Sequence, residues 1–229
     1  MTQRIYAVPI SPFLPSRSLL LSSFLFLFLV MTPALPGADT EYWHESIFAF
    51  DLDEGASMEI GFEQQFVDQC SKFALYNFTL EPSFRLDARS SMGFGFRHER
   101  EKEDGIWTTE DRYWLHYASK HRAGKWTFKF RPLLEYRNLA ERDAWLLRPK
   151  LFIQHPARIG KKAVKFSIVG DPYYAFYAGA VRQKRISAGI TFDLARKTEC
   201  SLYYLRKLKW SGDDWKTTHV IGSELVFSY

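Results

Sequence analysis

The 229-residue sequence lacks an apolar stretch long enough for a transmembrane helix. Its one long apolar run, residues 19–31, is 13 residues long, whereas a membrane-spanning helix needs about 20. Mean hydropathy is only −0.26. Two cysteines are present, so the chain can form one internal disulfide at most. Helical periodicity is also scarce, because apolar residues almost never recur at spacings of three or four. No HExxH motif, phosphate-binding loop or metal-ligand spacing occurs, and we expect no metal and no cofactor.

Aromatic and charged residues are abundant instead. Twenty Phe, 12 Tyr and 7 Trp make up 17% of the chain, and charged residues make up 25%. Disordered chains contain few aromatic and few other apolar residues, so this chain is expected to fold. Its length favours a single domain. The fold must therefore accommodate both populations in one domain.

Residues 1–38 have the features of a secretory signal peptide. Arg4 and Arg17 precede the apolar run, and no acidic residue occurs before Asp39. We expect cleavage after Ala38 or Ala34, and an uncleaved N-terminal anchor is the alternative. The remaining chain would carry a net charge of 29 − 26 = +3. Such a mild excess, on an exported chain, does not indicate nucleic-acid binding.

The rest of the chain alternates between apolar and polar residues with a period of two, which is typical of strands with two different faces. Phe128 and Phe130, for example, alternate with Lys129 and Arg131. About ten such segments follow residue 56, joined by short connections at one end and longer or more polar ones at the other. This pattern predicts an all-β fold, a transmembrane antiparallel up-and-down β-barrel with aromatic residues facing lipid and charges in the lumen.

Alternation alone does not determine which face is inside. A soluble periplasmic β-barrel or sandwich that binds a ligand would turn its apolar face inward. Three features favour the membrane. Aromatic residues recur near strand ends, as interfacial girdles require, and the segments exceed the about 5–6 residues of an ordinary strand. The chain also stops inside a strand, on Tyr229.

The C-terminus resembles the assembly signal of bacterial outer-membrane barrels. Gly222 is followed by Leu225 and Phe227, two residues apart, and by the terminal Tyr229. Val220 is a departure, because a polar residue is usual at that place. The resemblance implies insertion into the outer membrane by the barrel-assembly machinery.

Further motifs resemble an uncharacterised barrel family. They comprise Trp43, segments 93–97 and 110–114, Arg131, segment 134–137, Arg148, Arg182, Arg185 and Gly189. From about Trp43 to Tyr229 the chain is similar to the domain of unknown function 2490. The resemblance implies an outer-membrane barrel of unestablished role. It therefore predicts a fold and a cellular location but no reaction.

The charged faces of the segments would meet inside such a barrel. They contribute Arg85, Arg97, Glu99, Glu110, Arg112, Lys129, Arg131, Glu135, Arg137, Arg148, Lys150, Arg185 and Asp193. Barrels of about eight strands have interiors that side chains fill, and unpaired charges away from water are costly. We therefore interpret these residues as a salt-bridged lumen that holds the barrel rigid. The alternative is a narrow pore whose basic lining prefers small anions.

Catalysis is the third hypothesis, in the form of an outer-membrane lipid-modifying enzyme. Such an enzyme needs a nucleophile, a His and an orienting group within mutual reach. His116 and Ser119 face opposite sides of one segment, whereas His219 and Ser223 share a face but lie about 13 Å apart. His44 is solitary in the sequence. We expect no catalytic residue and no enzyme.

Residues 39–55 do not fit the ten-strand scheme. They alternate poorly, and a strand here would begin on the far side of the membrane from an exported N-terminus. We predict a periplasmic or lumen-entering segment, followed by the barrel over residues 56–229. The alternative is a barrel of twelve strands, which includes this segment and divides residues 163–177 at Gly170. The scheme separates Cys70 and Cys200 by a membrane thickness, beyond the about 7 Å that a disulfide allows, so we predict two free thiols.

Overall fold

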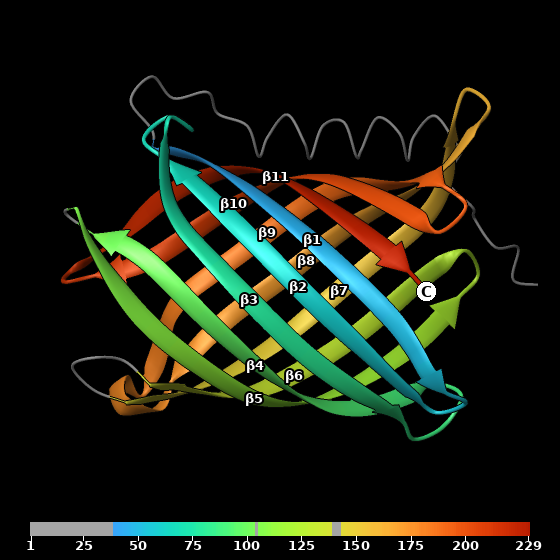
Figure 1. The fold of residues 1–229 in the computed structure, drawn as a ribbon, viewed down its shortest axis with the longest axis horizontal. Coiled ribbons are helices and arrows are strands. Elements are labelled where there is room, and N and C mark those ends of the chain that lie inside the picture. Colours follow the sequence, from blue (N-terminus) through green and yellow to red (C-terminus); the bar gives the residue numbers. More distant parts are fainter. Residues whose placement is uncertain (1–38, 104, 139–142) are drawn as a thin grey trace, which may run out of the picture. The chain divides into compact units, whose positions relative to one another are not determined.

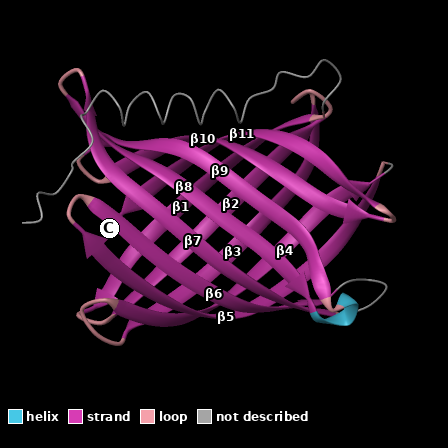
Figure 2. Cartoon of the chain, turned by 180° about the vertical axis from the view of Figure 1, so that it is seen from behind, coloured by secondary structure: helices cyan, strands magenta, loops and turns pink. Residues whose placement is uncertain are grey.

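The computed structural model describes residues 39–103, 105–138 and 143–229. Across them, eleven strands form one closed barrel (Figure 1). The strands are β1 (Thr40–Asp53), β2 (Ala56–Val67), β3 (Lys72–Arg85), β4 (Ser90–Glu103), β5 (Ile106–Ala123), β6 (Trp126–Asn138), β7 (Ala144–Ile159), β8 (Lys162–Ala175), β9 (Ala180–Ala195), β10 (Thr198–Ser211) and β11 (Asp214–Ser228). One 3₁₀ turn, η1 (Phe176–Ala178), joins β8 to β9 (Figure 2). No helix among the described residues is long and apolar enough to cross a membrane.

The barrel closes through a parallel pair of strands. Every other pair is antiparallel between sequence neighbours, but β1 lies parallel to β11, from Thr40 opposite His219 to Ala49 opposite Ser228. The odd number of strands requires this, since the first and last strands of such a meander run in the same direction. The barrel therefore begins at one rim, here called the N-terminal rim, and ends at the other, the C-terminal rim.

The connections differ between the two rims. Those at the C-terminal rim span residues 54–55, 86–89, 124–125, 160–161 and 196–197, and those at the N-terminal rim span residues 68–71, 104–105, 139–143, 176–179 and 212–213. Gly124 and Gly160 begin two-residue turns with φ of 59° and 60°, a region that glycine enters without steric cost. Among the described connections, residues 68–71 and 176–179 at the N-terminal rim and residues 86–89 at the C-terminal rim are four residues long, so the predicted difference in length between the rims is confirmed only in part.

The two faces of each strand differ in burial. In β5, Arg112, Trp114 and His116 are buried, whereas Leu115 between them is 60% exposed. The indole Nε1 of Trp114 donates to Glu81 Oε2 of β3 at 3.0 Å, although β5 and β3 are not neighbours in the sheet. Side chains of such strands meet only across the lumen. The charged face is thus inside the barrel and the apolar face outside.

These observations confirm the predicted all-β closed barrel and correct two details. The prediction of a separate segment at residues 39–55 is wrong, because residues 40–53 form β1. The apolar–polar alternation of β1 is weak because apolar residues lie on both of its faces. Trp43 packs inside against Leu205 and Val220, and Phe48 stacks on Phe227 outside. The twelve-strand alternative correctly included this segment in the barrel, but its division of residues 163–177 is wrong, because β8 runs unbroken through Gly170. The predicted signal peptide lies outside the described residues.

The two cysteines lie near opposite rims. Cys70 is exposed in the β2–β3 connection at the N-terminal rim, and Cys200 lies near the start of β10 at the C-terminal rim. Both are free, which confirms the prediction of two free thiols.

Candidate functional site

The lumen contains a continuous belt of ten charged side chains. This charge belt consists of Glu63 of β2, Arg97 and Glu99 of β4, Glu110 and Arg112 of β5, Glu135 and Arg137 of β6, Arg148 and Lys150 of β7, and Asp171 of β8. Five are acidic and five are basic, so the formal charge of the belt is zero. Every one of the ten has an oppositely charged partner within the belt.

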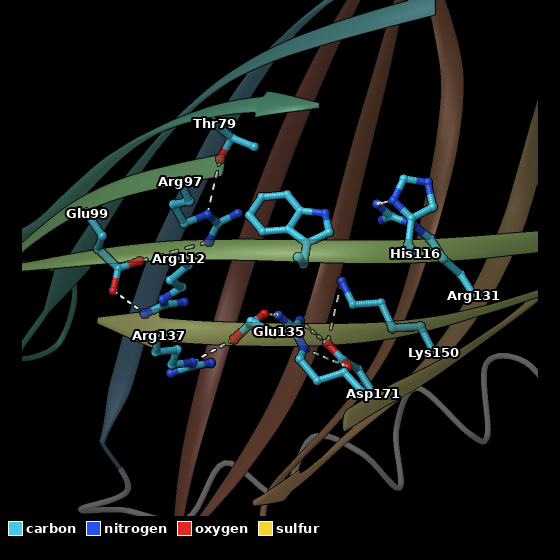
Figure 3. Close-up of polar contacts among 12 residues, drawn as sticks. Thr79, Arg97, Glu99, Arg112, His116, Arg131, Glu135, Arg137, Lys150 and Asp171 are labelled. Carbon is cyan, nitrogen blue, oxygen red and sulfur yellow. Dashed lines mark hydrogen bonds and ion pairs between the residues drawn. The ribbon is translucent and has the colours of Figure 1, made fainter. Parts of the chain in front are cut away.

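The first half of the belt runs from β2 to β5, and Figure 3 shows its members Arg97, Glu99 and Arg112. Arg97 Nη1 lies 3.3 Å from Glu63 Oε2, and Arg97 Nε donates to Thr79 Oγ1 at 3.1 Å. Arg112 contacts Glu99 with one terminal nitrogen and places its Nε 2.8 Å from Glu110 Oε1. Each guanidinium thus connects groups on two strands and fixes their relative position.

The second half continues from β6 to β8. Glu135 accepts a hydrogen bond from Arg137 Nε at 2.6 Å through one oxygen and contacts Arg148 through the other. Arg148 Nη2 then donates to Asp171 Oδ2 at 2.7 Å, and Lys150 Nζ lies 3.6 Å from the same oxygen. Glu135 is only 1% exposed, so this carboxylate depends on the two arginines rather than on water.

Aromatic and apolar side chains close the remaining side of the lumen. The guanidinium of Arg185, on β9, lies 5.1 Å from the ring centre of Tyr173 and 4.9 Å from that of Trp43. Tyr173 in turn stacks on Arg148 at 4.0 Å. Trp43 belongs to an apolar patch with Leu205 and Val220. Arg185 therefore lies between Tyr173 of β8 and Trp43 of β1 inside the lumen.

Two cavities lie in the lumen, one near each rim. One, of about 560 Å³, is near the N-terminal rim, and its lining includes Arg137, Tyr173 and Lys209. The other, of about 510 Å³, is near the C-terminal rim, and its lining includes Arg85 and Lys129. We call these cavities the N-terminal and C-terminal vestibules of the lumen.

A smaller polar cluster lies between the belt and the C-terminal vestibule. Arg131 Nη2 lies 2.5 Å from Glu81 Oε1 and donates to His116 Nδ1 at 3.3 Å. Trp114 shares the same carboxylate. His116 therefore contributes a hydrogen-bond acceptor to the interior, and Ser119 lies on the opposite face of β5 as expected.

The predicted lumen residues divide into five groups. Arg97, Glu99, Glu110, Arg112, Glu135, Arg137, Arg148 and Lys150 meet in the charge belt. Arg131 pairs with Glu81, and Arg185 lies between two aromatic rings. Arg85 and Lys129 line the C-terminal vestibule, and Asp193 is exposed near the same rim. Within the described ranges, no group of three potential metal ligands is found.

Three residues that contact the belt or Arg185 were not predicted from the sequence. Asp171 and Tyr173 lie next to Gly170 and Pro172, which favour a loop, and Trp43 lies in the segment that was not assigned to the barrel. The alternation could have placed Asp171 and Tyr173 in the lumen, because they lie two residues apart and in phase with Lys165 and Ser167 on the polar face.

The C-terminal segment packs against β1. Phe227 stacks on Phe48 and Tyr229 on Phe50, both with ring centres 5.1 Å apart. A Cβ atom on Gly222 would lie 2.0 Å from the ring of Tyr203, so the ring lies directly over this glycine and would have to move to admit a larger residue. Leu225 pairs with Ser46 of β1. The segment completes the barrel, and its role as an assembly signal stays a prediction.

The comparisons with known proteins identify one family. The family described as "Protein of unknown function (DUF2490)" matches residues 40–218, from the start of β1 into β11. No curated protein and no solved structure matches the chain.

Proposed function

The chain belongs to the DUF2490 family, and from this premise we propose that it is an integral barrel of the bacterial outer membrane whose lumen is closed to ions by the charge belt. Its function is structural, in that it presents a rigid, sealed scaffold within the membrane. One observation carries the proposal: the charges pair inside the barrel while the large apolar side chains lie outside.

The outer surface supports a membrane environment. Large apolar side chains are exposed around the barrel, on nearly every strand: Phe62, Phe84, Met92, Phe94, Leu115, Phe130, Leu134, Trp145, Leu147, Leu151, Ile186, Leu202 and Ile221. Soluble monomers rarely expose contiguous apolar patches larger than about 300–600 Å². A ligand-binding barrel in water would place such side chains inside, which favours the outer-membrane proposal over that alternative.

Aromatic pairs near both rims support the same environment. Tyr76 and Trp107 contact each other near the N-terminal rim with ring centres 5.6 Å apart, and Trp210 and Trp215 do so at 5.4 Å. Phe50 and Tyr229 stack at the C-terminal rim. Girdles of aromatic residues at two levels are typical of strands that cross both interfaces of a bilayer.

The belt favours a sealed lumen over an anion pore. An anion-selective filter needs an excess of Arg or Lys exposed to the permeating ion. Here the basic members of the belt pair with an equal number of carboxylates, and Arg112 and Arg148 are buried. The opposite charges of these pairs compensate each other, so they leave little electrostatic attraction for a passing anion.

Flotation tests the proposed membrane location. The full chain, expressed in a bacterium with an outer membrane, is expected to float with outer-membrane vesicles through a density gradient, to resist carbonate extraction and to need detergent for release. Its unheated form is expected to migrate differently from its boiled form on a gel, because a closed barrel keeps its structure in mild detergent. Release in soluble form by osmotic shock would contradict the proposal.

A further inference from the structure

The parallel seam of the barrel brings together polar side chains that are distant in sequence. His44 of β1 lies directly opposite Ser223 of β11. Both side chains point outward, since their neighbours Trp43 and Gly222 face the lumen. His44, solitary in the sequence, thus has a partner 179 residues away, and the register of β1 on β11 creates this contact.

His44 bonds to a serine through each ring nitrogen. Nδ1 lies 2.8 Å from Ser223 Oγ, and Nε2 lies 3.2 Å from Ser46 Oγ on the same strand. The hydroxyl of Tyr42 lies 2.8 Å from Ser223 Oγ. In the tautomer that carries its proton on Nδ1, His44 donates to Ser223 and accepts from Ser46. Ser46 is then the hydroxyl that the imidazole can deprotonate, and Ser223 orients the ring.

We propose that Ser46, His44 and Ser223 form a hydrolytic site for the acyl esters of membrane lipids, on the outer face of the barrel. The roles are those of a serine hydrolase: Ser46 is the nucleophile, His44 the general base, and Ser223, held by Tyr42, the positioning residue. Such constellations are recognised by geometry and role rather than by fold. The proposal rests on the membrane location proposed above, since it requires lipid at this surface.

The position of the site selects the substrate class. Tyr42, one pleat nearer the N-terminal rim, contacts Phe66 with ring centres 6.1 Å apart, and Phe66 contacts Phe73 at 5.5 Å. Phe48, on the other side, is flanked by Phe62 and Phe227. The site therefore lies between an aromatic row near the rim and an apolar band. In a bilayer this level holds the ester groups that join headgroups to acyl chains.

The reaction balances with water as the second substrate. Ser46 Oγ attacks the ester carbonyl carbon and passes its proton to His44 Nε2. The bond from that carbon to the glycerol oxygen breaks, and the leaving alcohol takes the proton from Nε2. Water then attacks the acyl-serine ester and gives a proton to His44, and the fatty acid leaves as Ser46 recovers its hydroxyl hydrogen. Because the orienting group is a neutral hydroxyl rather than a carboxylate, we expect a slow enzyme.

The test uses the full chain reconstituted in vesicles of phosphatidylethanolamine and phosphatidylglycerol. Flotation of these vesicles first establishes that the barrel is inserted, so failure of the membrane proposal is seen separately. The inserted wild type is expected to release lysophospholipid and to be labelled by a lipid-like fluorophosphonate on Ser46. Ser46→Ala is expected to abolish labelling, and His44→Phe to slow release about 100-fold, a typical contribution of a general base.

The positioning role has its own readout. Ser223→Ala is expected to slow release about tenfold, and Ser223→Thr, which keeps a hydroxyl, to restore it. His98→Phe and Ser119→Ala, which change an outward histidine and an outward serine elsewhere, serve as matched controls and leave the rate unchanged. An inserted wild type that releases no more lysophospholipid than Ser46→Ala, or that is labelled on another residue, overturns the proposal.

Discussion

Glu135→Ala is expected to lower the free energy of unfolding by about 3–5 kcal/mol, the usual cost of removing one partner of a buried ion pair. Glu135 is 1% exposed and holds Arg137 and Arg148 through its two oxygens. Without it, two guanidinium groups lose a carboxylate in a region that water hardly reaches. Urea unfolding in detergent micelles, followed by tryptophan fluorescence, measures the loss.

A second ion pair provides the matched control. Glu199 and Lys165 lie 2.7 Å apart, but their side chains are 41% and 43% exposed. Exposed pairs contribute about 0–1 kcal/mol, so Glu199→Ala is expected to have little effect. Glu135→Leu combined with Arg148→Met is expected to recover part of the loss, because it also removes the Arg148 guanidinium that Glu135→Ala deprives of a carboxylate. Arg137 keeps Glu110 as a partner, and Asp171 keeps Lys150. Equal, small effects of Glu135→Ala and Glu199→Ala would show that the belt is hydrated rather than buried.

The wild-type barrel is expected to insert into planar lipid bilayers without producing conductance steps. Arg185 lies inside the lumen between Trp43 and Tyr173, and the charge belt lines the other side. Arg185→Ser combined with Trp43→Ala removes the two side chains that bridge β9 and β1. We expect this variant to conduct in discrete steps with weak ion selectivity, since the ten charges that remain in the belt sum to zero.

A matched variant separates the belt from the vestibules. Lys129→Ala enlarges the C-terminal vestibule, away from Arg185 and Trp43, and is expected to produce no conductance steps. Arg185→Ser alone provides a measurement in case the double variant inserts poorly. This single variant is expected to give smaller or rarer conductance steps than the double variant. Anion-selective steps from the wild type would contradict a sealed lumen and support the basic pore that the sequence leaves open.

The two-faced strands were predictable because each of them has a different environment on either side. Phe128 and Phe130 alternate with Lys129 and Arg131, and a period of two survives any uncertainty about strand ends. Nearly all of the charge belt followed from the same alternation. Pairing within the belt was predictable only in general terms, because cross-strand partners depend on the register of several strands at once.

The first strand shows where this reasoning fails. β1 carries Trp43 inside and Phe48 outside. Because both faces of the strand carry aromatic residues, the alternation between apolar and polar residues is lost. The assumption that both ends of the barrel share one rim then removed β1 from the count. The same error hid the contact between His44 and Ser223, because no spacing in the sequence reveals a pair created by the closure of the barrel.

Spin labels along β5 test most directly whether the apolar face meets lipid and the charged face the lumen. Cys70 and Cys200 are free, so both can become serine before single cysteines are introduced from Asp111 to Ser119 in the bilayer-inserted protein. Accessibility to oxygen, which concentrates in lipid, is expected to alternate with a period of two and to peak at Tyr113, Leu115 and Tyr117. Oxygen peaks at Arg112, Trp114 and His116, or greater accessibility of Leu115 to a water-soluble nickel chelate than to oxygen, would contradict this orientation of the strands.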